Sequence, residues 1–403
     1  YHNLALTLVF KSSIYFMYHL TIPISFSSTF LALPPFCRII KNINKKRGNP
    51  YAQDDQMTLK NGHLPCFAGK PVDRMPIKLF SPYIGMNFGA SYQDAFVEAK
   101  SRAHWLIESY KRFGQDGLSV NYRIDGIPVA FGAESTYDPL GIPMIKENIL
   151  KDFSEIDQLD LEKIRFENDP NAQTAFEAVQ IIQDALNDEI FTGVGLMGPF
   201  TTAANLAGVE IILKSMRKDK EGLHKLLDFA ADITIEVGRK FVENQIGIGL
   251  AEPTASLLSP KQFREFVIPY YVKVMDKWKE WGSRGSGFHI CGDTTKLLET
   301  FPEMGIRGVS IDSAVDIAVA KDLVGDKLSI MGNVSPIEIL RGTPESIEQA
   351  VIDCFRKCWD NPRGFTIAPG CDIPVQTSLE NIDAYMSAAR KCAKYPVQPS
   401  NWE

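Results

Sequence analysis

The chain has 403 residues, of which 45% are hydrophobic and 23% charged, a composition typical of a folded protein with a sizeable core. Its formal net charge is -6 and its Lys and Arg residues form no clustered face, which argues against a nucleic-acid partner. The seven cysteines are scattered and odd in number, unlike a secreted disulfide framework. Reduced thiols or metal binding in a cytoplasmic protein are therefore expected.

The first 56 residues differ in character from the rest. Residues 4–36 are apolar, and a basic cluster follows at 41–47, an order typical of a signal-like or membrane-spanning segment. No small-residue cleavage site is evident, and Met57 is a plausible start. We therefore expect residues 1–56 to be an extension outside the working protein, with a targeting or anchor segment as the alternative.

From residue 57 to residue 394 we expect one domain without membrane contact, followed by a tail at 395–403. Strands are predicted at 76–84, 117–124, 190–197, 246–251, 287–291, 308–312, 327–332 and 364–368. Helices are predicted over 94–113, 171–187, 202–216, 220–244, 260–281, 294–304, 314–324, 344–359 and 379–391. About eight strand-then-helix units predict an α/β fold, a (β/α)8 barrel of the TIM type. A doubly wound open sheet is the alternative, but no Gly-x-Gly-x-x-Gly fingerprint follows any strand.

In such a barrel the carboxyl ends of the strands form the active face. Polar residues that end separate strands are therefore expected to meet there. They are Asp125, Glu252, His289, Cys291, Asp312, Asn333 and Cys371.

The clearest pattern among these residues predicts a metal site. His289 and Cys291 stand two residues apart on a predicted strand, so their side chains leave the same face. Cys371 follows the last predicted strand in a Pro-Gly-Cys-Asp turn. One histidine and two cysteines are three of the four ligands of a tetrahedral zinc, which leaves one position for chemistry. The alternative is a hydrogen-bonded core histidine beside cysteines that pack as small hydrophobic residues.

Three strand-end polar residues are candidates for catalytic roles. Glu252 is either a fourth zinc ligand that a substrate thiol displaces, or a carboxylate that caps a helix or pairs with an arginine. Asp312 and Asn333 are expected to hydrogen-bond to the ligands or to the substrate.

A cofactor is expected to contact the segment that follows the strand at 190–197. Its candidate residues are Met197, Gly198 and Phe200, together with Asn333, although Phe200 is equally consistent with core packing. Cys354 and Cys358 share a helix face with apolar neighbours and are predicted to be core residues.

The domain resembles the uroporphyrinogen decarboxylase superfamily and, within it, the zinc-dependent corrinoid methyltransferase branch. The resemblance spans residues 57–394, and the family fold is a TIM-type barrel. Its landmarks are Pro71-Val72-Asp73-Arg74-Met75-Pro76, Ser259-Pro260, Pro269-Tyr270, His289-x-Cys291-Gly292, Met331-Gly332-Asn333-Val334 and Pro369-Gly370-Cys371. One departure is the stretch 61–65, which would break the helix that usually precedes the first of these landmarks.

The resemblance implies a zinc-dependent enzyme that moves a methyl group between a methylated corrinoid and a zinc-activated thiol such as coenzyme M. A small corrinoid protein is the implied partner. The decarboxylase itself is disfavoured, because residues 80–85 hold none of the arginines of its Arg-Gln-Ala-Gly-Arg signature. Two alternatives stay open: a lyase acting on a tetrapyrrole or another carboxylated substrate, and a non-catalytic barrel that binds corrinoid and holds a structural zinc.

Overall fold

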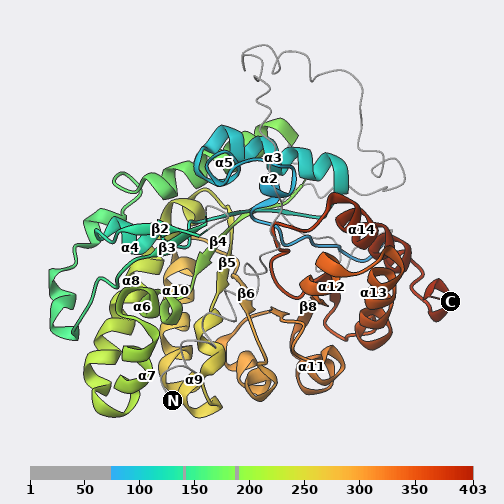
Figure 1. Ribbon diagram of the computed structural model, residues 1–403. Coiled ribbons are helices and arrows are strands. Elements are labelled where there is room, and N and C mark those ends of the chain that lie inside the picture. The colour runs from blue at the N-terminus through green and yellow to red at the C-terminus, as the bar shows by residue number, and fades with distance from the viewer. Residues whose placement is uncertain (1–73, 139–141, 187–189, 403) are drawn as a thin grey trace, which may run out of the picture.

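The computed structural model of the protein describes residues 74–138, 142–186 and 190–402. Its centre is a curled sheet of seven parallel strands in the order β1-β4-β5-β6-β7-β8-β9, with helices along its outer side (Figure 1). The strands are β1 (Leu118–Asn121), β4 (Thr192–Met197), β5 (Gly247–Ala251), β6 (Gly287–Ile290), β7 (Gly308–Ile311), β8 (Ser329–Val334) and β9 (Phe365–Pro369). A separate antiparallel hairpin joins β2 (Ser135–Tyr137) to β3 (Pro143–Ile145). The α/β class and the parallel sheet are as predicted.

Helices connect successive strands and bury one apolar side against the sheet. They are α2 (Ile84–Asn87), α3 (Ala99–Phe113), α4 (Gly126–Ala130), α5 (Pro170–Leu186), α6 (Pro199–Ala207), α7 (Val209–Lys218), α8 (Lys220–Glu243), α9 (Pro260–Phe266), α10 (Ile268–Glu280), α11 (Ile317–Val324), α12 (Pro336–Arg341), α13 (Pro344–Cys358) and α14 (Leu379–Ala393). Residues 295–304 form a 3-10 helix.

Two helices that the sequence predicts as continuous are each divided in the structure. The predicted helix 202–216 is divided between α6 and α7 by Gly208, whose φ of 87° suits glycine and terminates a helix. The predicted helix 260–281 is divided between α9 and α10 just before Pro269, which has no N–H to continue the helical hydrogen bonds.

Helix α8 illustrates how local sequence fixes the packing around the sheet. The Asp219 carboxylate accepts a hydrogen bond from Gly222 N at 2.9 Å and so caps the first turn. Farther along, Gly238 faces the fully buried Trp278 of α10, where an added Cβ would lie 2.2 Å from the indole ring. A glycine is required at this position because the indole occupies the space that any side chain would fill.

The first predicted strand, 76–84, was wrong in extent. Only Ile77 pairs with the sheet, through a parallel bridge to Ile367 of β9, and residues 84–87 form α2 instead. The Asp116 carboxylate accepts the N–H of Ile77 at 2.7 Å, and Pro82 has no N–H to offer a ladder. The Ile77 carbonyl nevertheless accepts from Asp116 N at 2.9 Å, so this short segment touches β9 on one side and the entry to β1 on the other.

Residues 1–56, the start at Met57 and the stretch 61–65 lie outside the described residues. Within the described ranges, no helix combines the length and apolarity needed to cross a bilayer. At the other end, residues 399–402 of the predicted tail form a 3-10 helix. Trp402 there is buried, with its ring centroid 6.1 Å from that of Phe355 and 6.0 Å from that of Trp359.

The contact between residues 76–78 and β1 gives a stability prediction. Asp116 accepts hydrogen bonds from both Arg74, at 2.8 Å, and Ile77 N, so Asp116→Ala removes the ion-pair partner of a largely buried guanidinium and the acceptor of a backbone N–H. We expect the free energy of unfolding to fall by roughly 2–4 kcal/mol in denaturant titrations. Asp322→Ala, on an exposed position of α11, is the control and should change it by less than about 0.5 kcal/mol.

Candidate metal centre

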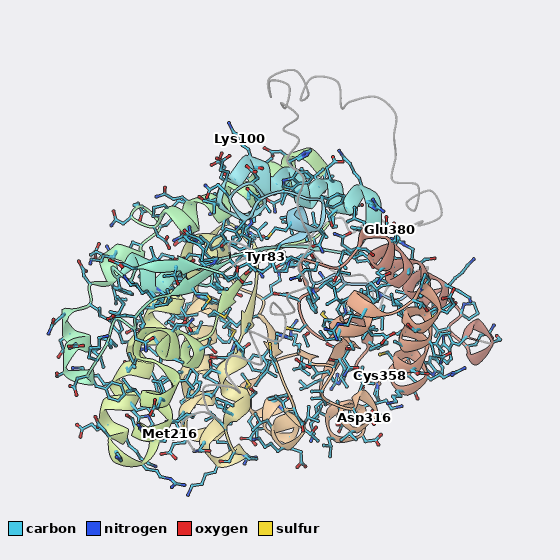
Figure 2. The ribbon with its side chains drawn as sticks, in the orientation of Figure 1. Tyr83, Lys100, Met216, Asp316, Cys358 and Glu380 are labelled. Carbon is cyan, nitrogen blue, oxygen red and sulfur yellow. The ribbon has the colours of Figure 1, made fainter. Side chains whose placement is uncertain are left out.

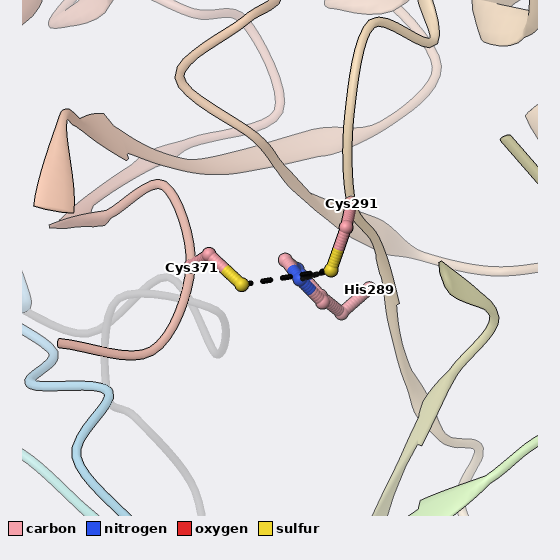
Figure 3. A group of neighbouring side chains, drawn as sticks. All are labelled: His289, Cys291 and Cys371. Carbon is pink, nitrogen blue, oxygen red and sulfur yellow. Dashed lines mark hydrogen bonds between the residues drawn. The ribbon is translucent and has the colours of Figure 1, made fainter. Parts of the chain in front are cut away.

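The histidine and both cysteines of the predicted zinc site meet at the carboxyl end of the sheet (Figure 3). His289 lies on β6, Cys291 directly follows that strand, and Cys371 follows β9. The His289 Nε2 atom is 3.2 Å from Cys291 Sγ, which is 3.5 Å from Cys371 Sγ. All three ligand atoms lie within 4.8 Å of one another, so a single ion can contact all of them.

The orientation of the His289 ring is set by a neighbour that the sequence did not single out. Ser310 pairs directly with His289 across β6 and β7, and its Oγ lies 3.0 Å from His289 Nδ1. With Nδ1 engaged in this way, Nε2 is the ring nitrogen that faces the two sulfur atoms. A serine inside a strand gives no signal in the sequence, because the residue opposite His289 is known only once the register is known.

Two of the predicted strand-end residues support the turn behind Cys291. Asp312 accepts the N–H of Gly292 at 2.9 Å, and Gly292 has a φ of 80°, a conformation that favours glycine. Asn333 donates to the backbone carbonyls of Asp312 at 3.0 Å and of Val315 at 2.7 Å. Their side chains therefore hold backbone rather than a ligand atom of the cluster.

The electrostatics of the cluster favour a bound cation. A hydrogen bond with Cys291, burial and the charge of Cys291 raise the pKa of Cys371 well above its usual range. Burial lowers the pKa of His289, but the hydrogen bond and charge of Cys371 more than offset this effect, so the net shift is upward. The neighbouring Cys291 thus disfavours the thiolate form of Cys371, and a divalent cation beside the two sulfur atoms would favour it. One imidazole and two thiolates are a donor set that suits zinc.

Glu252 is not part of this cluster. Its buried carboxylate accepts the N–H groups of Phe200 at 3.0 Å and Thr201 at 2.7 Å, so it caps the amino end of α6. Burial raises the pKa of Glu252 to about 7, against the opposing effect of these hydrogen bonds. The structure therefore shows Glu252 in the helix-capping role, and the cluster itself consists of His289, Cys291 and Cys371.

The candidate cofactor-binding residues are not all found in one place. Phe200 is completely buried in the hydrophobic core, which corrects its assignment to a pocket wall. Gly198 packs against Glu252, where an added Cβ would lie 2.3 Å from a carboxylate oxygen. Met197 lines a cavity, and the Asn333 amide is committed to the carbonyls named above. A position near a strand end therefore does not predict which of these side chains lines the cavity.

The cavity has a volume of about 2340 Å³ and is lined by all three members of the cluster. Among the described residues, three acidic ones line it: Asp125, Glu210 and Asp372. Asp125 is paired with Arg123 at 2.6 Å, and Asp372, directly after Cys371, has its pKa raised to about 6 by burial. Asp372 was not predicted as a site residue. Its position directly after Cys371, at the end of the last strand, was the feature of the sequence that could have identified it.

Three other cysteines, Cys354, Cys358 and Cys392, are buried, and the first two confirm the prediction of core packing. Burial raises the pKa of Cys354 to about 11 and that of Cys358 to about 12. Cys358 lies on α13, in the layer of helices outside the sheet (Figure 2).

A family model described as uroporphyrinogen decarboxylase (URO-D) matches residues 58–392. The chain belongs to the uroporphyrinogen decarboxylase family. It is 28% identical over 330 residues to the methylcobamide:CoM methyltransferase MtbA of Methanosarcina acetivorans, covering 80% of this chain and 94% of that protein. It is 25% identical over 348 residues to the methylcobamide:CoM methyltransferase MtaA of Methanosarcina barkeri, covering 83% and 98%. These findings confirm the resemblance drawn from the sequence.

A solved structure of a methyltransferase from Methanosarcina mazei has the same fold. It superimposes with a TM-score of 0.69 at 24% sequence identity, covering 83% of this chain and 99% of that one. The α/β architecture with a curled parallel sheet is thus shared over the whole length of that relative.

We predict that Ser310→Ala weakens zinc binding about ten-fold, because His289 loses the partner that orients its ring. A zinc-chelator competition titration measures the affinity, and circular dichroism checks the fold. Ser310→Thr, which keeps the hydroxyl, should bind zinc nearly as well as the wild type. Equal affinity in the wild type and Ser310→Ala would show that the hydroxyl has no positioning role.

The Glu252 carboxyl gives a pH prediction. Its pKa in the folded protein, about 7, lies above the ordinary value of 4.5, so the folded state holds the proton more tightly between these values. Its contribution to stability is therefore present at low pH and lost as pH rises through 7, by roughly 2–3 kcal/mol between pH 5 and pH 8. In denaturant titrations, the free energy of unfolding of Glu252→Gln should not show this fall between pH 5 and pH 8. An identical pH dependence in both proteins contradicts the assignment.

Proposed function

We propose that residues 57–394 form a zinc-dependent methyltransferase that moves a methyl group between a methylated corrinoid and a thiol such as coenzyme M. The observation that carries this proposal is the convergence of His289, Cys291 and Cys371 on one point beside a large cavity. The similarity of this chain to methylcobamide:CoM methyltransferases supports a corrinoid and coenzyme M as the two substrates. In this proposal residues 76–78 act as the eighth strand and close a (β/α)8 barrel between β9 and β1.

The three residues would hold zinc through His289 Nε2 and the two sulfur atoms, leaving one coordination position for a substrate. When bound there, zinc supplies a substrate thiolate at neutral pH, where a free thiol with a pKa near 8.5 is largely protonated. The protein's own contribution is positional. Ser310 fixes the imidazole and Asp312 fixes the turn that carries Cys291.

The thiol and the corrinoid meet in the cavity beside these residues. A substrate thiolate sulfur forms the new carbon–sulfur bond while the carbon–cobalt bond breaks, and the bonding electron pair stays on cobalt. The walls of the cavity matter because they keep water away from the reacting groups. The ring of Phe80 lies 6.2 Å from that of His289, centroid to centroid, and covers one side of the cluster.

A corrinoid is bulky, and we propose that a small corrinoid protein presents it at the carboxyl end of the strands. The β2–β3 hairpin supports this arrangement, because it carries two large apolar side chains that face solvent. Tyr137 is 61% exposed and Met144 is 37% exposed, and Met144 also lines the cavity. An exposed apolar pair at the rim of a site is typical of a surface that a partner covers.

The zinc content of the purified protein tests the proposal. The wild type should hold about one zinc per chain, and Cys371→Ala should lose both the metal and methyl transfer from methylcobalamin to coenzyme M. Cys358→Ala, which removes a buried thiol of α13 that is not part of the cluster, is the matched control and should keep both.

Two results would point to other functions. Porphyrinogen turnover that survives His289→Ala would favour the lyase alternative, since decarboxylation does not need these ligands. A wild type that holds zinc but admits no thiol to it, as measured by X-ray absorption, would indicate a structural metal in a non-catalytic corrinoid-binding protein. Absence of stoichiometric zinc would contradict the methyltransferase proposal itself.

A further inference from the structure

The cavity has a second end, opposite the metal cluster, and basic side chains surround it. Each of the four loops ahead of β6, β7, β8 and β9 contributes one exposed cation to its lining. They are Arg284, Arg307, Lys327 and Arg363. Each stands one to three residues before its strand begins, so all four lie at the amino ends of parallel strands.

Three of these cations are held close together by the sheet. Neighbouring parallel strands are about 4.8 Å apart, so the loops ahead of β7, β8 and β9 place Arg307, Lys327 and Arg363 side by side. Hydrogen bonds fix the loops to one another. Ser329 N donates to the carbonyl of Arg307 at 3.0 Å, and Arg363 Nε donates to the carbonyl of Asp326 at 2.9 Å.

Three of these cations lack an ion-pair partner in the described part of the chain. No described carboxylate pairs with Arg307, Lys327 or Arg363, whereas Lys321 on nearby α11 pairs with Asp360 at 2.9 Å. Among the described residues that line the cavity, nine are Lys or Arg and three are Asp or Glu. The chain as a whole has a net charge of -6, whereas the lining of this cavity carries an excess of cations, which favours an anionic ligand.

Buried polar atoms without partners lie at the same end. Gln115 is 2% exposed and Thr192 is 4% exposed, and both line the cavity. The Oε1 atom of Gln115 and the hydroxyl of Thr192 have no hydrogen-bond partner among the described residues. Lys78 also lines this region, and its ammonium lies 5.3 Å from the centroid of the Phe191 ring. Of the two polar atoms without partners, the Thr192 hydroxyl can donate to an anionic ligand, whereas the Gln115 oxygen is an acceptor and needs a donor.

We propose that the amino-end mouth of the cavity is a binding site for a phosphate or diphosphate group, held by Arg307, Lys327 and Arg363. Guanidinium groups bind phosphate oxygens in pairs, and a diphosphate carries enough negative charge to offset three cations. The site is separate from the metal cluster and does not depend on the proposed methyl transfer. The phosphate group comes either from a free inorganic anion or from a small ester such as a nucleoside diphosphate.

Isothermal titration calorimetry on the full chain at low ionic strength tests the site, with inorganic pyrophosphate and ADP as separate probes. The wild type should bind one anion per chain, with affinity that falls as salt is added. The double variant R307Q/K327Q should bind at least about ten-fold more weakly, because two of the three cations are gone. The variant R264Q/K277Q removes two exposed cations outside the cavity and should bind as the wild type does.

Each outcome bears on the proposal. Tighter binding of ADP identifies an ester as the ligand class, and equal binding identifies the diphosphate group alone. No heat with either probe up to millimolar concentration, or equal affinity in both double variants, overturns the site. Pyrophosphate should also raise the melting temperature of the wild type and not that of R307Q/K327Q. Zinc content should stay the same in both, which separates this result from failure of the metal centre.

Discussion

The candidate metal centre depends on the curl of the parallel sheet. Strands β6 and β9 are three positions apart in the sheet, which in a flat sheet would separate them by about 14 Å. In the structure the sulfur atoms of Cys291 and Cys371, which follow these strands, are 3.5 Å apart. The cluster therefore exists only because the sheet bends, and contacts that maintain the bend, such as those of residues 76–78, act indirectly on the chemistry.

Strands β7 and β8, which lie between β6 and β9, also contribute side chains that support the metal ligands. Ser310 on β7 contacts the His289 ring, and Asp312, just beyond β7, holds Gly292 next to Cys291. Asn333 of β8 then fixes the backbone of Asp312. A series of hydrogen bonds thus runs from β8 to Gly292, the residue after Cys291. Rigid support of this kind matters because a single cation must contact the imidazole and both sulfur atoms, and small displacements of these atoms would weaken its binding.

Local periodicity made much of this architecture predictable from the sequence. His289 and its neighbouring cysteine share a face because strand side chains alternate, and Cys371 was found because a Pro-Gly turn marks the end of the last strand. Features that depend on register or on orientation were not predictable. Ser310 is one, since only strand pairing places it against an imidazole. Glu252 is another, because its strand-end position did not reveal that its side chain turns toward the next helix. The segment 76–84 has the composition of a strand, but the N–H of Ile77 donates to the Asp116 side chain instead of to the backbone of a neighbouring strand.

The sequence distance between the two cysteines has a consequence for folding. They are 80 positions apart, so an ion bound by both joins the ends of a loop that contains β7, β8 and α13. An ion that binds only the folded state stabilises it by mass action. An ion held by this cluster would therefore stabilise the tertiary structure of the last third of the protein, and its removal would weaken this region first.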